Sequence, residues 1–357
     1  MKGKHNFSAG PAILPAEVIQ EAAAGVLNIN NTGLSILEVS HRDKDFMAIM
    51  EEARSLVTEL MGLGSEYKVL FLGGGASLQF AMVPSNLLVT GGTAAYVDTG
   101  VWAHKAIKEA KMISNVNIVA SSENEKYNHI PKNYTIPTDA SYLHITSNNT
   151  IYGTQMHEFP NSPIPIVCDM SSDIFSRRVD FSKFDLIYAG TQKNMGAAGA
   201  TMVVVKESIL GKTGRKMFSM LDYQVHIKGE SMYNTPPVFS VYACLLTMRW
   251  LKKNGGLAWI EEINRKKAEL MYSEIDRNSL FTGTVVKEDR SWMNATFLLT
   301  KPELEETFNK MWKEAGIVGI KGHRDVGGYR ASMYNALTVE DVQALVDVMK
   351  DLEKKNG

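Results

Sequence analysis

The segment Leu186-Ile187-Tyr188-Ala189-Gly190-Thr191-Gln192-Lys193-Asn194-Met195-Gly196 joins a strand signal to a reactive side chain. Its first four residues form an apolar run that predicts a buried strand, and Gly190 opens a loop. The loop presents Lys193 where ligands usually bind in α/β folds, at the end of a strand. By itself, a lysine in a loop is usually a solvated surface charge. Its interpretation therefore depends on the residues that the rest of the chain places around it.

Strands and helices alternate along most of the chain. Residues 68–72 predict a strand that runs into the glycine loop Gly73–Ser77, and residues 78–82 predict a helix after it. Further strands are predicted at residues 94–98, 142–146, 164–168, 184–189 and 201–205, with a helix at 102–110. This alternation predicts an α/β fold in which helices cover both faces of a mostly parallel sheet.

The pattern changes after Lys206, and a linking helix further along predicts a division into domains. The first stretch contains two prolines and a glycine, so residues 1–15 are expected to form an extended arm. A helix at 241–251 ends at Asn254-Gly255-Gly256, and a linking helix follows. We therefore predict a large domain at 16–256 and a smaller α+β domain at 257–357.

The composition limits the class of protein and its partners. The 357 residues are 45% hydrophobic and 22% charged, with a net charge of −1, which gives no electrostatic argument for binding nucleic acid or an anionic membrane. The two cysteines argue against a disulfide scaffold and fit a reducing compartment. No apolar signal region follows the charged N-terminus, and no apolar run is long enough to span a bilayer. We expect a soluble cytoplasmic protein.

Asp169 gives Lys193 a chemical partner. The acid ends one predicted strand and the lysine follows the next, so both can face the same crevice. Pyridoxal phosphate chemistry requires such a pair, because the amine binds the cofactor aldehyde and the carboxylate keeps the pyridine nitrogen protonated. The glycine loop at 73–77 would hold the cofactor phosphate. Further contacts with the cofactor are expected from Trp102, Thr150 and Gln192.

Beyond these features, the chain resembles the phosphoserine aminotransferases, a class-V family of fold-type-I pyridoxal-phosphate enzymes, over essentially its full length. Six segments carry the resemblance: residues 6–15, 38–42, 68–71, 188–194, 232–237 and 320–335. The resemblance implies a mostly parallel seven-stranded sheet in the large domain and a smaller α+β C-terminal domain. It also implies a homodimer that shares its active sites across the interface.

The resemblance implies a role for each matching residue. Lys193 would be the Schiff-base lysine, and Asp169 the partner of the pyridine nitrogen. Trp102 would stack on the ring. The residues in contact with the cofactor would be Ala76, Ser77, Trp102, Thr150, Asp169, Gln192 and Lys193, together with Asn234 and Thr235 from the partner subunit.

For the substrate, the resemblance implies a basic pocket. His41, Arg42, His323 and Arg324 would bind the phosphate of phosphoserine or the side-chain carboxylate of glutamate. Arg330 would clamp the α-carboxylate, a task that suits a bidentate guanidinium. Two positions depart from some family members: Ser77 stands where they have a basic residue, and Ala9 where they have serine. Neither departure touches the chemical step.

The resemblance implies a ping-pong transamination. L-Glutamate would leave its amine on the cofactor and depart as 2-oxoglutarate, and 3-phosphohydroxypyruvate would take the amine and leave as phosphoserine. Lys193 would move the proton between the substrate Cα and the cofactor, as general base and acid. The family also acts on a phosphorylated hydroxythreonine in pyridoxine biosynthesis, and the sequence does not decide that activity for this chain.

Two other functional interpretations of the sequence compete with the aminotransferase interpretation. A dinucleotide-binding oxidoreductase would use the strand and glycines at 69–75, but Leu78 stands where the third small residue is needed for close packing of helix and strand. Within the same fold, another amino donor or a lyase-like activity is the closer alternative, although Arg42, His323 and Arg324 favour an anionic substrate tail. No histidine pair has metal-binding spacing, so no metal is expected.

Overall fold

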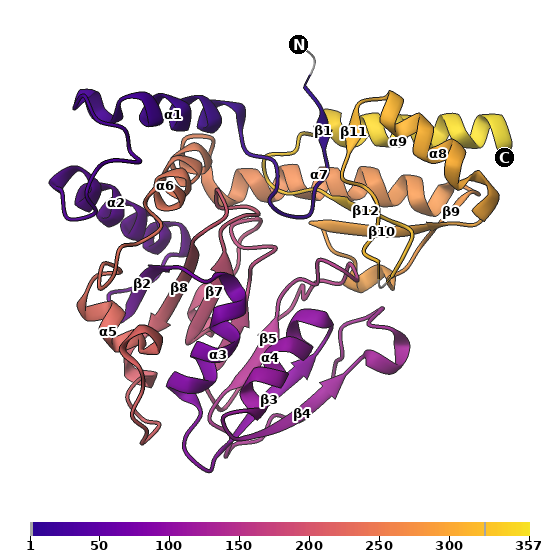
Figure 1. Cartoon of the computed structure of the whole chain (residues 1–357). Coiled ribbons are helices and arrows are strands. Elements are labelled where there is room, and N and C mark those ends of the chain that lie inside the picture. Colours follow the sequence, from indigo (N-terminus) through magenta and orange to yellow (C-terminus); the bar gives the residue numbers. More distant parts are fainter. Residues whose placement is uncertain (1–2, 325) are drawn as a thin grey trace.

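A seven-stranded sheet, in the order β2-β8-β7-β6-β5-β3-β4, forms the centre of the fold (Figure 1). The computed structural model describes residues 3–324 and 326–357, so Met1 and Lys2 of the predicted arm, and Asp325, lie outside the described residues. The strands are β2 (Tyr67–Leu72), β3 (Thr93–Asp98), β4 (Asn115–Ser121), β5 (Leu143–Thr146), β6 (Ile166–Asp169), β7 (Leu186–Gly190) and β8 (Thr201–Lys206). β8 pairs antiparallel with β2 and β7, whereas the other neighbours are parallel. The prediction of a mostly parallel sheet is confirmed.

Helices cover both faces of this sheet, as the sequence predicted. Helices α1 (Ala16–Leu27), α2 (Lys44–Met61) and α6 (Val238–Lys253) lie on one face, and α3 (Gly75–Leu87) and α4 (Val101–Lys111) on the other (Figure 1). The short helix α5 (Tyr223–Lys228) packs beside β2. Alternate strand residues enter opposite cores, so that Ile187 packs with the α2 and α6 side while Tyr188 packs with the α3 side.

A smaller three-stranded antiparallel sheet, in the order β12-β10-β9, organises the C-terminal part. Its elements are α7 (Gly256–Arg277), β9 (Phe281–Gly283), β10 (Asn294–Leu299), α8 (Glu305–Glu314), β12 (Tyr329–Ser332) and α9 (Val339–Asn356). Thr338 and Asp341 form a capping box at the start of α9. The division at residue 256 stays a prediction. Ile260 belongs to the core of the large sheet and Ala268 to that of the small one, so α7 reaches both.

Helix α7 carries a lysine that is fully buried away from the large sheet. The Lys267 amine donates hydrogen bonds to the carbonyl oxygens of Met333, Tyr334 and Leu337 at 3.0, 2.8 and 2.9 Å. Burial lowers the pKa of Lys267 to about 7. These bonds fix the turn between β12 and α9, which also contacts the loop after β7 through Asn335.

The N-terminal arm connects the two sheets. Its strand β1 (His5–Asn6) pairs in parallel with β11 (Ile317–Val318), and Phe7 is buried in the C-terminal core (Figure 1). Further along, the Tyr334 hydroxyl donates to the Ala9 carbonyl at 2.9 Å, and the Ala12 amide donates to the Gln192 carbonyl at 2.9 Å. The arm therefore passes beside the loop that carries Lys193.

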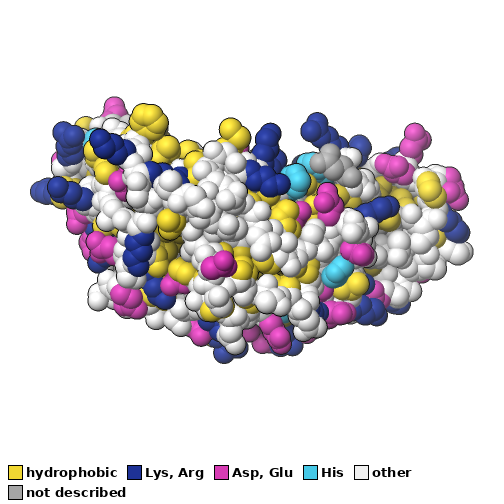
Figure 2. Space-filling view, turned by 90° about the horizontal axis from the view of Figure 1, so that it is seen from below, with side chains coloured by type: hydrophobic (Ala, Val, Ile, Leu, Met, Phe, Trp, Pro, Cys, Tyr) yellow, Lys and Arg dark blue, Asp and Glu magenta, His cyan; other side chains and the backbone are white. Residues whose placement is uncertain are grey.

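The surface shows no area dominated by one sign of charge on the face drawn in Figure 2. Basic and acidic side chains are interspersed there, and hydrophobic side chains occur in separate small areas. This mixture agrees with the net charge of −1. Within residues 3–324 and 326–357, no helix has both the length and the hydrophobicity needed to cross a membrane.

Candidate active site

A cavity of about 330 Å³ lies where the carboxyl ends of the parallel strands meet the C-terminal part. Strands β5 and β6 deliver Thr146 and Asp169 to it, and the loop after β7 delivers Lys193. This is the edge of an α/β sheet at which ligands usually bind. The cavity is lined by Ala9, Gly10, Gly75, Ala76, Ser77, Trp102, Thr146, Asn148, Thr150, Ile151, Asp169, Ser171, Ser172, Gln192, Lys193, His323 and Arg330.

Lys193 is buried in the wall of this cavity, with 8% of its surface exposed. Its Nζ donates to the Thr150 hydroxyl at 2.8 Å. The pKa of the amine is lowered to about 8: burial is the main cause, the carboxylate of Asp169 opposes the shift, and the positive charge of Arg330 adds to it. A substantial fraction of this amine is neutral near pH 8, which is the nucleophilic form.

Asp169 lies at the end of β6, one strand away from the lysine loop. Its Oδ1 accepts a hydrogen bond from the Ser171 amide at 2.9 Å. Burial raises the pKa of this carboxyl, whereas hydrogen bonds from the Ser171 side chain and amide, and the charge of Lys193, lower it. A cationic group bound in the cavity would stabilise the ionised form.

Helix α3 supplies an anion-binding end to the cavity. It begins at Gly75, after Gly74 in the left-handed conformation (φ +90°), and Gly74 has no side chain to cap it. Gly75, Ala76 and Ser77 line the cavity, so the unpaired amides of the first turn lie at its wall. These amides and the helix dipole favour a phosphate group. The helix starts three residues earlier than Leu78, where we predicted it.

Three polar atoms in the residues that line the cavity are buried without a hydrogen-bond partner among the described residues. They are Trp102 Nε1, Thr146 Oγ1 and Arg330 Nε. A buried polar group left unpaired is costly, and a bound polar ligand would satisfy it. Together with the lysine, the acid and the helix end, these atoms fit pyridoxal phosphate, which has an aldehyde, a pyridine nitrogen and a phosphate.

Arg330 brings a positive charge to the cavity from the small sheet. It lies on β12, and its guanidinium donates to the Thr150 carbonyl at 3.3 Å. His323 lines the same cavity from the loop before β12. The residues that suit the cofactor therefore come from the large sheet, and a basic group comes from the small sheet.

One chain gathers most of the predicted residues but not all of them. The cavity includes Ala76, Ser77, Trp102, Thr150, Asp169, Gln192, Lys193, His323 and Arg330. The residues that do not line it are His41, Arg42, Asn234, Thr235 and Arg324. Arg42 precedes α2, and Asn234 and Thr235 precede α6; all three are exposed.

Several cavity residues had no role in the prediction. Ser171 and Ser172 lie two and three residues after Asp169, and Asn148 stands in the polar loop after β5. The polar composition of both segments, at the ends of strands, was a usable signal. Gly10 has no comparable signal, because its place beside the Lys193 side chain depends on the path of the arm.

Comparisons with known proteins agree with this geometry. The model of the family described as Aminotransferase class-V matches residues 4–345. The chain is 66% identical to a phosphoserine aminotransferase of Flavobacterium psychrophilum, with 99% of each chain covered, and 55% identical to one of Phocaeicola vulgatus, with 98% and 99% covered. Among solved structures, a phosphoserine aminotransferase of Bacillus circulans superposes with a TM-score of 0.97 at 45% identity over all of both chains. A pyridoxal-phosphate-bound one of Trichomonas vaginalis gives 0.92 at 35%, covering 97% of this chain and 99% of the other.

Proposed function

This chain belongs to the class-V aminotransferase family, and on that premise we infer that it transfers the amino group of L-glutamate to 3-phosphohydroxypyruvate, giving O-phospho-L-serine and 2-oxoglutarate. Its cofactor is pyridoxal phosphate. The observation that carries the proposal is the cavity that joins Lys193, Asp169 and the end of helix α3 to Arg330.

When bound, pyridoxal phosphate supplies an aldehyde that accepts the amino group and a ring that stabilises negative charge at the substrate Cα. The residues around it have distinct tasks. Lys193 holds the cofactor and moves the proton at Cα, for which its lowered pKa suits it. Asp169 pairs with the pyridine nitrogen and keeps it protonated. Ala76 and Ser77 bind the phosphate, with Thr150 and Gln192 contributing hydrogen bonds and Trp102 a ring contact.

Substrate binding rests on the basic residues. Arg330 binds the α-carboxylate that glutamate and phosphoserine share, because its guanidinium reaches the cavity beside Lys193. His323 lines the cavity, and we propose that His41, Arg42, His323 and Arg324 bind the anionic tail. One basic pocket then serves both half-reactions, since the tail is a carboxylate in glutamate and a phosphate in phosphoserine.

The experiment that tests this function is a coupled assay of the purified protein. Glutamate is the amino donor, and 3-phosphohydroxypyruvate is compared with oxaloacetate as acceptor. We expect a strong preference for the phosphorylated acceptor. Equal rates with both acceptors would contradict the assignment and favour another aminotransferase of the same fold. A third arm with 4-phosphohydroxy-L-threonine as donor tests the pyridoxine-pathway activity.

We also propose that the enzyme is a homodimer with shared sites. Exposed apolar side chains flank the residues that a single chain leaves outside the cavity: Leu37 is 64% exposed near Arg42, and Tyr233 is 49% exposed beside Asn234. A second copy of the chain could pack over these side chains. Both segments would then lie at the dimer interface, where they could reach the cavity of either subunit. Asn234 and Thr235 would then contact the phosphate of the partner's cofactor.

A hybrid dimer distinguishes whether Arg42 serves its own cavity or that of the partner. Arg42→Ala is expected to raise the KM for 3-phosphohydroxypyruvate at least about tenfold, because a charge-assisted hydrogen bond is lost. We then mix Arg42→Ala chains with Lys193→Ala chains. If Arg42 acts across the interface, each hybrid contains one site with both changes and one intact site.

The expected result is that the mixture regains a component with the wild-type KM. Differently tagged chains allow the hybrid to be purified, and sedimentation checks that it is a dimer. A hybrid that retains the high KM would place Arg42 in its own chain's site. An active monomer would overturn the shared-site proposal altogether.

The lowered pKa of Lys193 predicts how cofactor loading depends on pH. Only the neutral amine attacks the aldehyde, and with a pKa of about 8 its fraction rises from about a tenth at pH 7 to about nine tenths at pH 9. The rate at which the apoenzyme captures pyridoxal phosphate should therefore rise about tenfold and level off above pH 9. Stopped-flow absorbance measures it. A rate still rising tenfold per pH unit at pH 10 would indicate an ordinary lysine.

The cytoplasm is the compartment that we propose. Cys168 and Cys244 are both buried, unpaired thiols. Free thiols of this kind fit a reducing environment. Fractionation of cells that express the chain tests the assignment.

A further inference from the structure

The side chain of Asn148 joins the loop after β5 to the small sheet. It is buried, and its Nδ2 donates to Ser172 Oγ and to Asn294 Oδ1, both at 2.8 Å. Its Oδ1 accepts a hydrogen bond from Ser291 Oγ. Both N–H groups and the oxygen of the amide are therefore used. An aspartate could not donate these bonds, and an alanine would remove all three and leave Asn294 Oδ1 without its donor, whereas Ser172 and Ser291 keep hydrogen bonds to the backbone.

The partners of Asn148 on the small sheet connect it to the strand of Arg330. Asn294 donates to Ser332 Oγ at 3.0 Å, and the two residues face each other in the pairing of β10 with β12. Arg330 lies two residues before Ser332, so both side chains point to the same face of the sheet. That face contacts the loop after β5, because Arg330 donates to the Thr150 carbonyl and Thr296 Oγ1 to the Tyr152 carbonyl at 2.9 Å.

We call this contact the seam: residues 147–155 on one side, residues 291–296 and strand β12 on the other. The backbones approach closely there. Gly153 has φ +85°, and a Cβ on it would lie 2.4 Å from Thr296 Oγ1 and 2.9 Å from the Asn294 carbonyl oxygen. Because a side chain at residue 153 would push the two sides apart, the geometry of the seam depends on this glycine.

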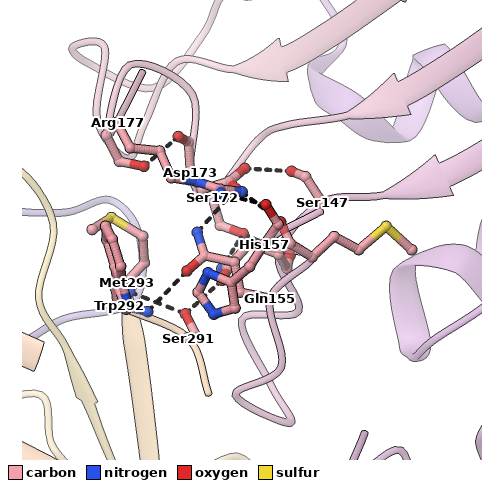
Figure 3. Close-up of polar contacts among 12 residues, drawn as sticks. Ser147, Gln155, His157, Ser172, Asp173, Arg177, Ser291, Trp292 and Met293 are labelled. Carbon is pink, nitrogen blue, oxygen red and sulfur yellow. Dashed lines mark hydrogen bonds and ion pairs between the residues drawn. The ribbon is translucent and has the colours of Figure 1, made fainter. Parts of the chain in front are cut away.

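A second group of buried polar residues holds the loop side of the seam. Figure 3 shows Ser147 and Asp173 in contact, with Ser291, Trp292 and Met293 of the C-terminal part facing them. Gln155 donates to Asp173 at 3.1 Å and accepts a hydrogen bond from the Trp292 amide at 3.0 Å. Asp173 is also 3.5 Å from the guanidinium of Arg177. The loop side is thus fixed to the segment that follows Asp169.

We propose that Asn148 is a positioning residue of the transamination: it holds the strand of Arg330 at a fixed distance from Lys193, so that the bound α-carboxylate places Cα beside the amine. The inference rests on the proposed role of Arg330 in binding that carboxylate. Asn148 touches Ser172, Asn294 and Ser291 and acts through them. Its removal changes the geometry of the substrate anchor, while the hydrogen bond from the Ser171 amide to Asp169 does not involve it.

The test compares Asn148→Ala with a matched buried asparagine of the C-terminal part. Asn278 also makes three side-chain hydrogen bonds: to Glu274 and to the Met349 carbonyl at 2.7 and 3.1 Å, and from the Leu280 amide at 3.0 Å. Asn278→Ala should therefore lower the Tm by a similar amount without disturbing the seam. Both variants are assayed as holoenzymes, well below their Tm.

For Asn148→Ala we expect about a tenfold rise in the KM for glutamate and about a tenfold weaker Kd for 2-oxoglutarate measured by calorimetry, which is the size of the loss of one or two net hydrogen bonds. The kcat should fall as well, because Cα is no longer placed correctly beside the amine. Ser291→Ala removes one of the three bonds, so a rise of about threefold is expected. If Asn148→Ala does not fold, Ser291→Ala takes its place in the test.

Two outcomes would overturn the proposal. One is that Asn148→Ala, or Ser291→Ala in its place, binds 2-oxoglutarate as tightly as Asn278→Ala does. The other concerns Arg330→Ala, which is measured in parallel. If that variant leaves both constants unchanged, Arg330 is not the anchor and the seam cannot act through it. A large effect of Arg330→Ala beside no effect of Asn148→Ala would leave the proposed function intact and refute the positioning role alone.

Discussion

Lys193→Ala is expected to abolish transamination, with kcat reduced by roughly 10⁴- to 10⁶-fold, the range seen when the central group of a catalytic unit is removed. Among the described residues that line the cavity, this amine is the only group that can both hold the cofactor covalently and move the proton at Cα. The wild-type holoenzyme should be yellow and should retain a covalent adduct on Lys193 after borohydride reduction, as peptide mapping can show. The variant should carry no adduct.

Lys267 offers a matched control for this experiment. It is also buried and also has a lowered pKa, to about 7, but its amine is bound to three backbone carbonyls and does not line the cavity. Lys267→Met should keep the colour, the adduct and the kcat. It should lower the Tm by several degrees, because three buried carbonyls lose their donor. A wild-type protein without bound cofactor, or an adduct on Lys267, would refute the assignment of Lys193.

Asp169→Asn is expected to have the second largest effect, a fall in kcat of roughly 10²- to 10³-fold, which is typical of removing a preorganised polar group from a buried site. The amide keeps the size of the side chain but cannot hold a positive charge on the pyridine nitrogen. Single-turnover measurements with glutamate isolate this effect from product release.

A variant of the nearby carboxylate Asp173 distinguishes an effect on catalysis from an effect on stability. It accepts hydrogen bonds from Ser147 and Gln155 and pairs with Arg177, so Asp173→Asn weakens a buried network. We expect Asp173→Asn to lower the Tm more than Asp169→Asn does, and to lower the kcat less. The reverse order, with Asp173→Asn the slower enzyme, would mean that the pyridine nitrogen has a different partner.

The core of the site was predictable from the sequence because its signals are local. Lys193 and Asp169 each follow an apolar run that can only be a buried strand, and the parallel arrangement brings such strand ends to one edge. The glycines at 73–75 likewise indicated a loop that leads into α3. In these cases residue type and position in a strand or helix contain the necessary information.

What could not be predicted depends on distant partners. Strand β4 was missed because exposed residues such as Asn115 and Asn117 interrupt its apolar pattern at the edge of the sheet. The reversed direction of β8 has no local signature. Asn148 has its role only because Ser291 and Asn294, far away in the sequence, fold against it. For Asn234, the partner that the resemblance implies is not in the same chain.

The pairing of β1 with β11 has a consequence for synthesis of the chain. His5 is synthesised before the seven-stranded sheet, yet the strand that holds it, at Ile317 and Val318, is synthesised after that sheet. The sheet can therefore fold as a unit before β1 meets its partner. Contacts between segments so distant in sequence form late, so β11 holds the arm that brings Ala9 and Gly10 to the cavity only after the sheet has been made.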